Sequence, residues 1–382
     1  MATITKRGNT YRIRTSCGYS VDGKQVVKSM TYKPWEGMSE KQIEKEVRRQ
    51  AVLFEESCKK GQAVTAAKFE TFAREWFRDC AELKLKRLTL CNYHRMEKRV
   101  YAALGHIRVD RISPLDIQRF VGSLNADGLA PSTVRNYVRF VSVILNYAVK
   151  KRIITYNPCV TVDYPEAREA EREIYTTEEV KKLLGLMWED GEDKRPFAVF
   201  FMLAAYTGCR KGELLGLEWK DADFANDVIS IRRAYYYSSA EHTSYTDTPK
   251  TKKSQRSLKL PGCVMEALRV LKAWQDRQRE VYGGSWVESD RLFTALDGSP
   301  MPTTAPYNYL QSFSRRNGFR KATVHSFRHF NASALIDAGV DVVTVQTALG
   351  HSTAATTLNI YSHAFSNAQT RAMEAIANAI NL

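Results

Sequence analysis

The spacing of apolar residues along this 382-residue chain changes from a period of two near the N-terminus to helical spacing further on. This change limits the folds that the chain can adopt. Near the N-terminus, "NTYRIRTS" alternates, so that Tyr11, Ile13 and Thr15 fall on one face of an extended segment and Arg12 and Arg14 on the other. A period of two predicts a β-strand. The "DGK" at 22–24 predicts a hairpin turn, and "KQVVKSMTYK" predicts a second strand. The chain therefore begins with a small antiparallel sheet.

Helical spacing begins with "SEKQIEKEVRRQAVLFEESCKKG", for which Ser39 is the expected N-cap and Gly61 lies past the end. Four further helical segments run from Phe69 to about Tyr156, each opening near a Ser, Thr or Pro start signal. The last has an apolar stripe that we expect to be core: Val134, Tyr137, Val138, Val141, Ile144 and Leu145. Basic residues lie off this stripe, so a four-helix module with a basic face is predicted.

The length predicts two or three domains, because a single core rarely grows this large. "GQAVTAAK" at 61–68 is typical of a linker, and the charged "PEAREAERE" at 165–173 of a connector. A third region opens with "YTTEEVKKLLGLM", where Thr176 or Thr177 can cap a helix. We expect domains at 1–64, 65–165 and 166–382, in a mainly α fold with small β elements (α+β).

The formal net charge is +15, and its excess lies in the first part of the chain. Residues 1–34 hold seven Lys or Arg against one Asp, whereas residues 171–382 are nearly balanced. A basic excess favours a polyanionic partner, most often nucleic acid, and a β-ribbon fits the major groove of DNA. A solvated charged surface is the simpler alternative. The candidate DNA contacts are Arg12, Arg14, Lys24 and Lys28 in the sheet and Arg135, Arg139, Lys150 and Lys151 in the helical module.

Several classes of protein are disfavoured by composition. No stretch of about 18 apolar residues is present, so no transmembrane helix is expected. The N-terminus has no apolar core of the kind found in secretory signals. The seven cysteines are scattered without a CxxC pair, which favours a reduced cytoplasmic protein without structural zinc.

Four sequence patches in the third region hold the candidate catalytic residues. In "AAYTGCRKGELLGLEWKD", Thr207–Gly208 ends one helix, Arg210 begins the next and Glu213 follows one turn later. In "TPKTKKSQRSLKLP" (248–261), a β-turn is expected with Lys250 at its tip and "SLKL" entering a strand. Alone, these patches are ordinary: a surface ion pair is worth little, and a charged hairpin is common.

The remaining two patches hold histidines. "VHSFRHFNASALIDAG" places His325 and Arg328 at i, i+3, so both can project from one helix face. "LGHSTAATTLNIYSH" places Tyr361 ten residues after His351. Taken singly, a histidine satisfied in the core and a half-buried tyrosine are the commoner roles.

In this order and spacing, the four patches resemble the boxes of the tyrosine recombinases, the phage and conjugative-transposon integrases. The resemblance implies that Arg210, Lys250, His325, Arg328 and His351 activate a DNA phosphate and that Tyr361 attacks it. It also implies that 1–64 is an arm-type DNA-binding domain and 65–165 a core-site DNA-binding domain. The implied partners are double-stranded DNA attachment sites of core and arm type and a homo-tetramer on DNA, with an accessory DNA-bending or excision protein among those such enzymes can have. No cofactor is implied.

These residue types suit the chemistry. Phosphodiester transfer builds negative charge on oxygens, and guanidinium groups offer bidentate hydrogen bonds to them. A phenol with a pKa of about 10 needs nearby positive charge or a base, which His325 can supply, and Lys250 can protonate the leaving oxygen. A 3′-phosphotyrosine would conserve the bond energy without ATP. The sequence has no Walker loop and no carboxylate pair for two metals, which agrees with metal-free chemistry.

Three alternatives to a recombinase would account for parts of the same sequence. A non-catalytic DNA-binding regulator could descend from the same fold, a type IB topoisomerase would use similar chemistry, and a metal-dependent nuclease would need ligands from His325, His329, His351 and His363. The tail "SNAQTRAMEAIANAINL" carries an apolar helix stripe that could dock on its own domain or on a neighbour: Met373, Ile376, Ala377 and Ile380.

Overall fold

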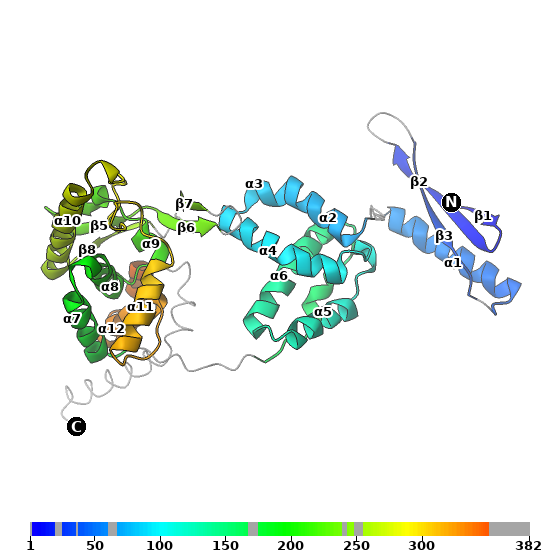
Figure 1. Ribbon diagram of the computed structural model, residues 1–382. Helices are drawn as coiled ribbons and strands as arrows, with labels where there is room; N and C mark the ends of the chain where they lie inside the picture. The colour runs from blue at the N-terminus through cyan, green and yellow to red at the C-terminus, as the bar shows by residue number, and fades with distance from the viewer. Residues whose placement is uncertain are drawn as a thin grey trace, which may run out of the picture. The chain divides into compact units, whose positions relative to one another are not determined.

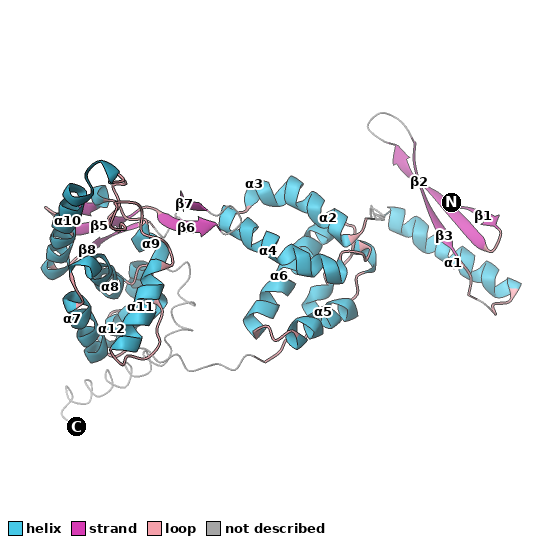
Figure 2. Cartoon of the chain, in the orientation of Figure 1, coloured by secondary structure: helices cyan, strands magenta, loops and turns pink. Residues whose placement is uncertain are grey.

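The computed structural model describes residues 2–19, 25–35, 37–59, 67–166, 175–238, 243–247 and 255–350 (Figure 1). The chain divides into two compact units, residues 1–170 and 171–382. Helices dominate both, and the strands form small antiparallel sheets (Figure 2). The mainly α fold with small β elements is therefore confirmed. No helix in the described part of the chain is long and apolar enough to span a membrane.

The first unit begins with a three-stranded sheet in the order β1-β2-β3. Its strands are β1 (Thr3–Arg7), β2 (Thr10–Tyr19) and β3 (Gln25–Tyr32), and helix α1 (Glu40–Lys59) follows. Ile13 of β2 pairs with Ile4 and Met30 and is fully buried together with Ala51 and Phe54 of α1. The alternation predicted for β2 is confirmed, because its apolar face is the one that packs on the helix.

A helical module follows in the same unit. It consists of α2 (Phe69–Trp76), continued by a π-helical turn (Phe77–Ala81) and α3 (Glu82–Lys84), then α4 (Arg87–Leu104), α5 (Pro114–Ala126) and α6 (Pro131–Lys150), with 3-10 turns at Val109–Arg111 and Pro158–Thr161. The predicted stripe of α6 is buried, apart from Tyr137 at its margin, and packs with Phe140 into one core.

The predicted start signals hold for only part of this module. Ser113 caps α5 in a reciprocal capping box with Asp116, and Pro131 opens α6. The residues before α2 and α4 are Lys68 and Lys86, which make no side-chain cap. The expectation of a Ser, Thr or Pro signal was wrong there. Backbone pairing serves α2 instead, since Phe69 N donates to the carbonyl oxygen of Ile107 at 2.8 Å.

The second unit alternates helices and short strands. Its helices are α7 (Thr177–Glu189), α8 (Arg195–Thr207), α9 (Lys211–Leu215), α10 (Gly262–Tyr282), α11 (Ala305–Arg316), α12 (Val324–Asp337) and α13 (Val342–Leu349), with 3-10 turns at Glu192–Lys194, Trp219–Asp221 and Gly283–Ser285. One sheet has the order β4-β5-β8, built from β4 (Ala222–Asp223), β5 (Val228–Ile231) and β8 (Arg256–Lys259). A separate hairpin pairs β6 (Ala234–Ser238) with β7 (Thr243–Asp247).

Helix α8 is the centre of this unit. It is apolar on nearly every side and contacts α7, α10 and α12, so Phe200, Phe201 and Leu203 are fully buried. Thr176 caps α7 as predicted, with its hydroxyl accepting from Glu179 N at 3.2 Å. Because α8 is enclosed, its C-terminal end at Thr207 is held rigidly.

Candidate active site

The candidate site is built on the turn that ends α8. Gly208 adopts the left-handed conformation there (φ +59°), as expected for the residue that closes a helix. A Cβ at Gly208 would come within 2.6 Å of Leu349 Cδ2 and 2.7 Å of Asn331 Oδ1. The Asn331 amide donates to the last carbonyl oxygens of α8, those of Ala205 (2.9 Å) and Tyr206 (3.0 Å). Three elements therefore meet at a turn that only glycine fits.

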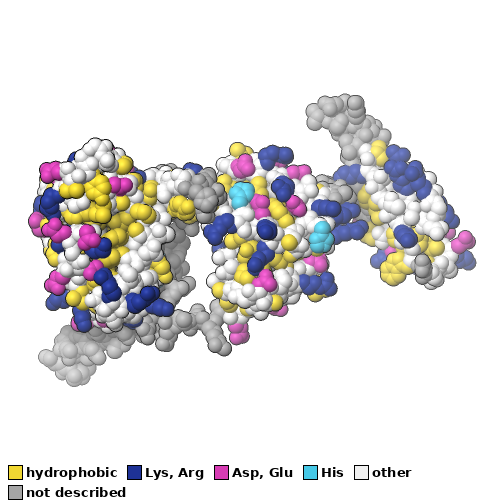
Figure 3. Space-filling model, viewed as in Figure 1, with side chains coloured by type: hydrophobic (Ala, Val, Ile, Leu, Met, Phe, Trp, Pro, Cys, Tyr) yellow, Lys and Arg dark blue, Asp and Glu magenta, His cyan; other side chains and the backbone are white. Residues whose placement is uncertain are grey.

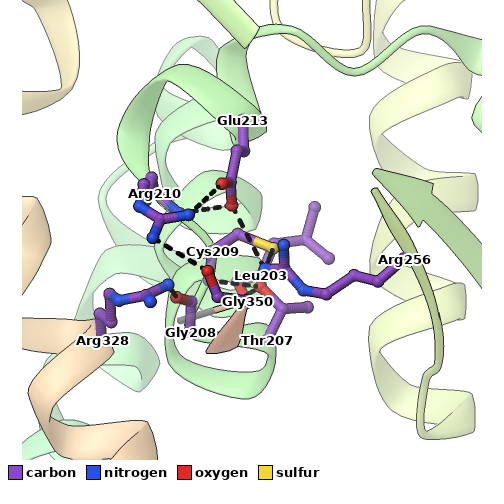
Figure 4. Close-up of polar contacts among 9 residues, drawn as sticks. All are labelled: Leu203, Thr207, Gly208, Cys209, Arg210, Glu213, Arg256, Arg328 and Gly350. Atoms are coloured by element: carbon purple, nitrogen blue, oxygen red, sulfur yellow. Dashed lines mark hydrogen bonds and ion pairs between the residues drawn. The ribbon is translucent and has the colours of Figure 1, made fainter. Parts of the chain in front are cut away.

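Arg210 begins α9 two residues after this turn, as predicted. Its backbone N–H donates to Glu213 Oε2 at 3.0 Å, and its Nη1 donates to Oε1 at 2.7 Å (Figure 4). Its Nη2 donates to the carbonyl oxygen of Gly350 at 3.1 Å. The side chain remains 38% exposed. The guanidinium is thus oriented by two partners and still open to a ligand.

Arg328 reaches the same turn from α12. It is 1% exposed, and its Nη1 donates to the carbonyl oxygen of Gly208 at 2.7 Å (Figure 4). The structure therefore brings Arg328 to the loop from which Arg210 projects, although 118 positions separate them in the sequence. Two guanidinium groups at one turn form the kind of cationic site that binds a phosphate.

His325 lies three residues before Arg328 on α12 and is exposed. Its ring centroid is 4.8 Å from that of His329, and the two rings are nearly perpendicular. His329 is buried. The two members of the predicted i, i+3 pair therefore differ in environment: Arg328 is enclosed, and His325 is accessible.

Three of the predicted catalytic residues, Lys250, His351 and Tyr361, lie outside the described residues. The segment carrying Lys250 joins β7 to β8, and the expected strand after it is present as Arg256–Lys259. Gly350 is the C-cap of α13 in the left-handed conformation, and His351 is the next residue. The structure therefore describes the strand that follows the Lys250 segment and the residue that precedes His351, and not these three residues themselves.

Glu213 and Arg256 complete the polar cluster, and neither was predicted to be part of the site. Arg256 Nη2 donates to Glu213 Oε2 at 3.2 Å and lies 3.1 Å from Cys209 Sγ. Burial raises the pKa of Glu213, but the charges of Arg256 and Arg210 outweigh it, so the net pKa is lowered. Burial raises the pKa of the Cys209 thiol. The cluster therefore combines an ionised carboxylate with a neutral thiol. The sequence signal for Arg256 was weak, because it is one of several basic residues in "PKTKKSQRSLK" (249–259).

The predicted DNA contacts of the helical module are all exposed: Arg135, Arg139, Lys150 and Lys151. At 100° per residue, the three on α6 fall within about 60° of one another around the helix. The Arg135 guanidinium lies 5.7 Å from the Tyr164 ring centroid, and Lys151 Nζ lies 5.3 Å from that of Tyr147. Figure 3 shows Lys and Arg side chains spread over the visible surface of this module.

The register of the N-terminal sheet separates its predicted contacts. Paired residues of antiparallel strands project to the same face, and Lys28 pairs with the buried Thr15. Lys28 therefore lies on the α1 side of the sheet, whereas Arg12 and Arg14 lie on the opposite face. Arg7 of β1 also lies on that opposite face, because it alternates with Thr5, which pairs with Arg12. Arg7 is therefore a further basic residue of the face that carries Arg12 and Arg14, and the sequence analysis did not name it. Lys24 lies outside the described residues.

Comparison with protein families matches residues 69–164 to the phage integrase central domain and residues 173–368 to the phage integrase family. The chain belongs to the phage integrase family. Among relatives of this integrase, a XerC-like tyrosine recombinase of Caldanaerobacter subterraneus is 28% identical over 79% of the chain and 80% of the relative. The ICEBs1 integrase of Bacillus subtilis is 26% identical over 94% of each chain. The chain is thus a site-specific DNA recombinase, a strand-transferring enzyme, and a non-catalytic regulator is not favoured.

Solved structures agree with the fold of this integrase. The Tn1549 transposon integrase in complex with a circular intermediate DNA matches 81% of this chain and 100% of its own, with a TM-score of 0.69 and 21% identity. A lambda integrase dimer bound to a core site matches 94% of this chain and 93% of its own, with a TM-score of 0.54 and 15% identity.

Proposed function

We propose that this chain cuts and rejoins DNA through a 3′-phosphotyrosine on Tyr361, at the site formed where Arg210 and Arg328 meet the Gly208 turn. The main support for the proposal is that Arg210 and Arg328 bring two permanent positive charges to this turn. Arg210 also contacts Gly350, the residue before His351. Arg210 is the accessible one of the pair, and Arg328 is anchored in the core. Preorganised donors of this kind are usually the largest catalytic contribution to transfers that build negative charge.

In the proposed reaction, Tyr361 Oη attacks the scissile phosphorus and forms a P–O bond, while the bond to the 5′ oxygen breaks. Arg210, Arg328 and His351 hydrogen-bond the phosphate oxygens, His325 assists removal of the phenol proton, and Lys250 protonates the leaving 5′ oxygen. The 5′ hydroxyl of another strand then attacks the 3′-phosphotyrosine, which reverses these bond changes and frees Tyr361. The number of phosphoester bonds is unchanged, so no ATP is required.

A nicked suicide substrate tests the nucleophile, because loss of the cleaved fragment prevents religation. The wild-type chain should form a covalent adduct with DNA that survives denaturation, in the presence of EDTA as well as in its absence. Tyr361→Phe should abolish the adduct and retain DNA binding, because it removes the attacking oxygen and keeps the ring. An adduct of normal yield from Tyr361→Phe would falsify the assignment.

We further propose that residues 1–64 bind arm-type sites and residues 65–165 bind core-type sites. The family match to a central domain at 69–164 supports the second boundary, and the separate apolar core of Ile13, Ala51 and Phe54 supports the first. The polar face with Arg7, Arg12 and Arg14 is suited to the major groove. DNA in the bacterial cytoplasm is the proposed place of action, with an accessory DNA-bending or excision protein as a further partner.

Assembly as a homo-tetramer on paired DNA sites is also proposed. Among the similar structures, a lambda integrase tetramer is bound to a Holliday junction, with a TM-score of 0.52 to this chain. The tail stripe formed by Met373, Ile376, Ala377 and Ile380 is the proposed link between protomers. The tail follows Tyr361 closely, so docking on a neighbour would make cleavage depend on assembly.

A further inference from the structure

Glu213 connects two parts of the second unit that are far apart in sequence. It lies in α9, its side chain is 3% exposed, and its carboxylate accepts from Arg210 on the same turn and from Arg256 at the start of β8 (Figure 4). Arg256 is 7% exposed at its side chain. Two cations therefore share one buried carboxylate, and only Arg210 of the two is substantially open to a ligand.

Arg256 is held at a fixed point of the sheet. It begins β8 and pairs with Ile231 of β5, which is buried in the main core of the unit. Six positions separate it from Lys250 on the segment that joins β7 to β8. The contact between Arg256 and Glu213 thus ties the base of the Lys250 segment to the helix that presents Arg210.

We propose that Arg256 is a positioning residue for strand cleavage, which keeps Glu213 ionised and oriented so that Arg210 is aimed at the scissile phosphate. The inference rests on the role proposed above for Arg210. Arg256 itself does not touch the phosphate. It acts through Glu213, so its effect should vanish when Glu213 can no longer carry charge.

The charges around Glu213 explain why Arg256 is needed. Burial opposes ionisation of Glu213 and raises its pKa, whereas the charge of Arg256, followed by the charge and the hydrogen bonds of Arg210, lowers that pKa. The other groups facing it are Tyr236 of β6, a phenol whose pKa is raised by burial, and the Cys209 thiol, whose pKa is also raised by burial. Both are neutral near pH 7. Loss of Arg256 would leave Arg210 as the one cation among these described neighbours, so the pKa of Glu213 would rise.

A protonated Glu213 would hold Arg210 less well, because one carboxyl oxygen then carries a proton and accepts fewer hydrogen bonds. Glu213 is ionised above its pKa, so Arg210 is oriented at high pH and released as the pH falls through that pKa. The cleavage rate should therefore fall on the acid side of the pH–rate profile, and replacement of Arg256 should move this acid limb to higher pH. Misplacement of a catalytic group by about 1 Å can cost about 100-fold in rate.

The experiment compares Arg256→Gln, Arg256→Lys and a matched control, Arg233→Gln. Arg233 is a similarly shielded arginine of the same unit, 17% exposed and paired with Asp221 and Glu218 away from Arg210. Formation of total covalent adduct on the suicide substrate is measured in single turnover from about pH 5.5 to 9, together with DNA binding and the melting temperature. All covalent adduct is counted, whichever residue carries it. The result for Arg256 therefore does not depend on whether Tyr361 is the nucleophile.

Arg256→Gln should cleave about 10- to 100-fold more slowly at pH 7, with unchanged DNA binding and an acid limb shifted to higher pH. Arg256→Lys should restore the position of the acid limb and part of the rate, because it returns the charge but not the forked geometry. Arg233→Gln should lower the melting temperature without shifting the limb. In a Glu213→Gln background, Arg256→Gln should add less than about a twofold further loss.

An unshifted acid limb in Arg256→Gln would overturn the proposal, as would a limb that shifts equally in Arg233→Gln. A full additional loss in the Glu213→Gln background would show that Arg256 acts independently of Glu213 and would also overturn it. If Arg256→Gln or Glu213→Gln does not fold, Arg256→Lys is compared with wild type. Because lysine keeps the positive charge, a shifted acid limb in Arg256→Lys would contradict an electrostatic role for Arg256.

Discussion

The Nη2 of Arg210 donates to the carbonyl oxygen of Gly350 across 3.1 Å, although 140 positions separate the two residues. Gly350 closes α13 and is followed directly by His351. The same guanidinium is held from its other side by Glu213. One side chain therefore links the start of α9 to the residue that precedes His351. This contact would couple the guanidinium proposed to bind the phosphate to the segment proposed to carry the nucleophile.

The two arginines should respond differently to removal. Arg210→Ala and Arg328→Ala should each slow adduct formation by at least about 100-fold, the scale for loss of one preorganised donor, with a smaller loss of DNA binding. Arg328→Ala should also lower the free energy of unfolding by about 1.5–3 kcal/mol, because it removes a buried charged donor from the Gly208 carbonyl. Single-turnover cleavage, DNA binding and thermal denaturation measure these effects. Equal losses of binding and cleavage would reduce the arginines to backbone anchors.

Gly208→Ala should destabilise the second unit more than an ordinary left-handed glycine would. The backbone conformation alone costs about 1–2 kcal/mol for a residue with a Cβ, and the contacts with Leu349 and Asn331 add to it. Gly318→Ala is the matched control, because Gly318 also has a positive φ (+70°) but has nothing within 4 Å of the added Cβ. Chemical denaturation of both variants compares them. If their losses of stability are equal, the turn has more room than its geometry indicates.

Deletion of residues 1–64 should leave binding to a core-type site and remove binding to a second, distant site. Within that segment, Arg14→Ala should weaken binding to the distant site more than Lys28→Ala, because the two side chains lie on opposite faces of the sheet. Footprinting on full attachment-site DNA and titration with an arm-type duplex measure these effects. An unchanged footprint after the deletion would contradict a separate DNA-binding module, and a dominant effect of Lys28 would place the DNA on the helix side.

Truncation after Phe365 should leave binding to a single site intact and weaken the multi-protomer complex on paired sites. The removed tail holds the apolar stripe of Met373 to Ile380, which a short terminal helix must bury to remain folded. Native gels with and without the tail measure the assembly. An identical tetrameric complex from both proteins would mean that the tail packs on its own domain. If the tail restrains Tyr361, truncation should also change the rate of cleavage by isolated protomers, whether the tail docks on its own domain or on a neighbour.

Local patterns predicted much of this fold, because their causes are local. The alternation around Ile13, the stripe of α6 and the cap at Thr176 each depend on residues within one or two turns. The start of α2 has no side-chain cap and depends instead on a backbone hydrogen bond to Ile107, which no local signal marks. The start of α4 also lacks a side-chain cap. The division between residues 1–64 and the helical module also depends on tertiary contacts, and it remains a prediction.

The candidate site could be predicted in its residue types and less well in its geometry. The i, i+3 spacing predicts that Arg210 and Glu213 form an ion pair, but as an ordinary surface pair, whereas Glu213 is buried in the site. The third member, Arg256, is 43 positions from Glu213 and joins it only through strand pairing. The position of Lys28 was missed for a related reason: its face of the sheet follows from the register with β2, which the sequence of one strand does not define.

The left-handed glycines Gly208 and Gly350 set a boundary on how such an enzyme can diversify. One precedes Arg210 by two positions, the other precedes His351 by one, and both hold conformations that disfavour every residue with a Cβ. A saturation-mutagenesis library selected for recombination should return nearly invariant glycine at both positions, while the exposed basic positions of α6 accept change. Retargeting to a new DNA sequence would then require changes on the DNA-recognition surfaces, while Gly208 and Gly350 stay unchanged.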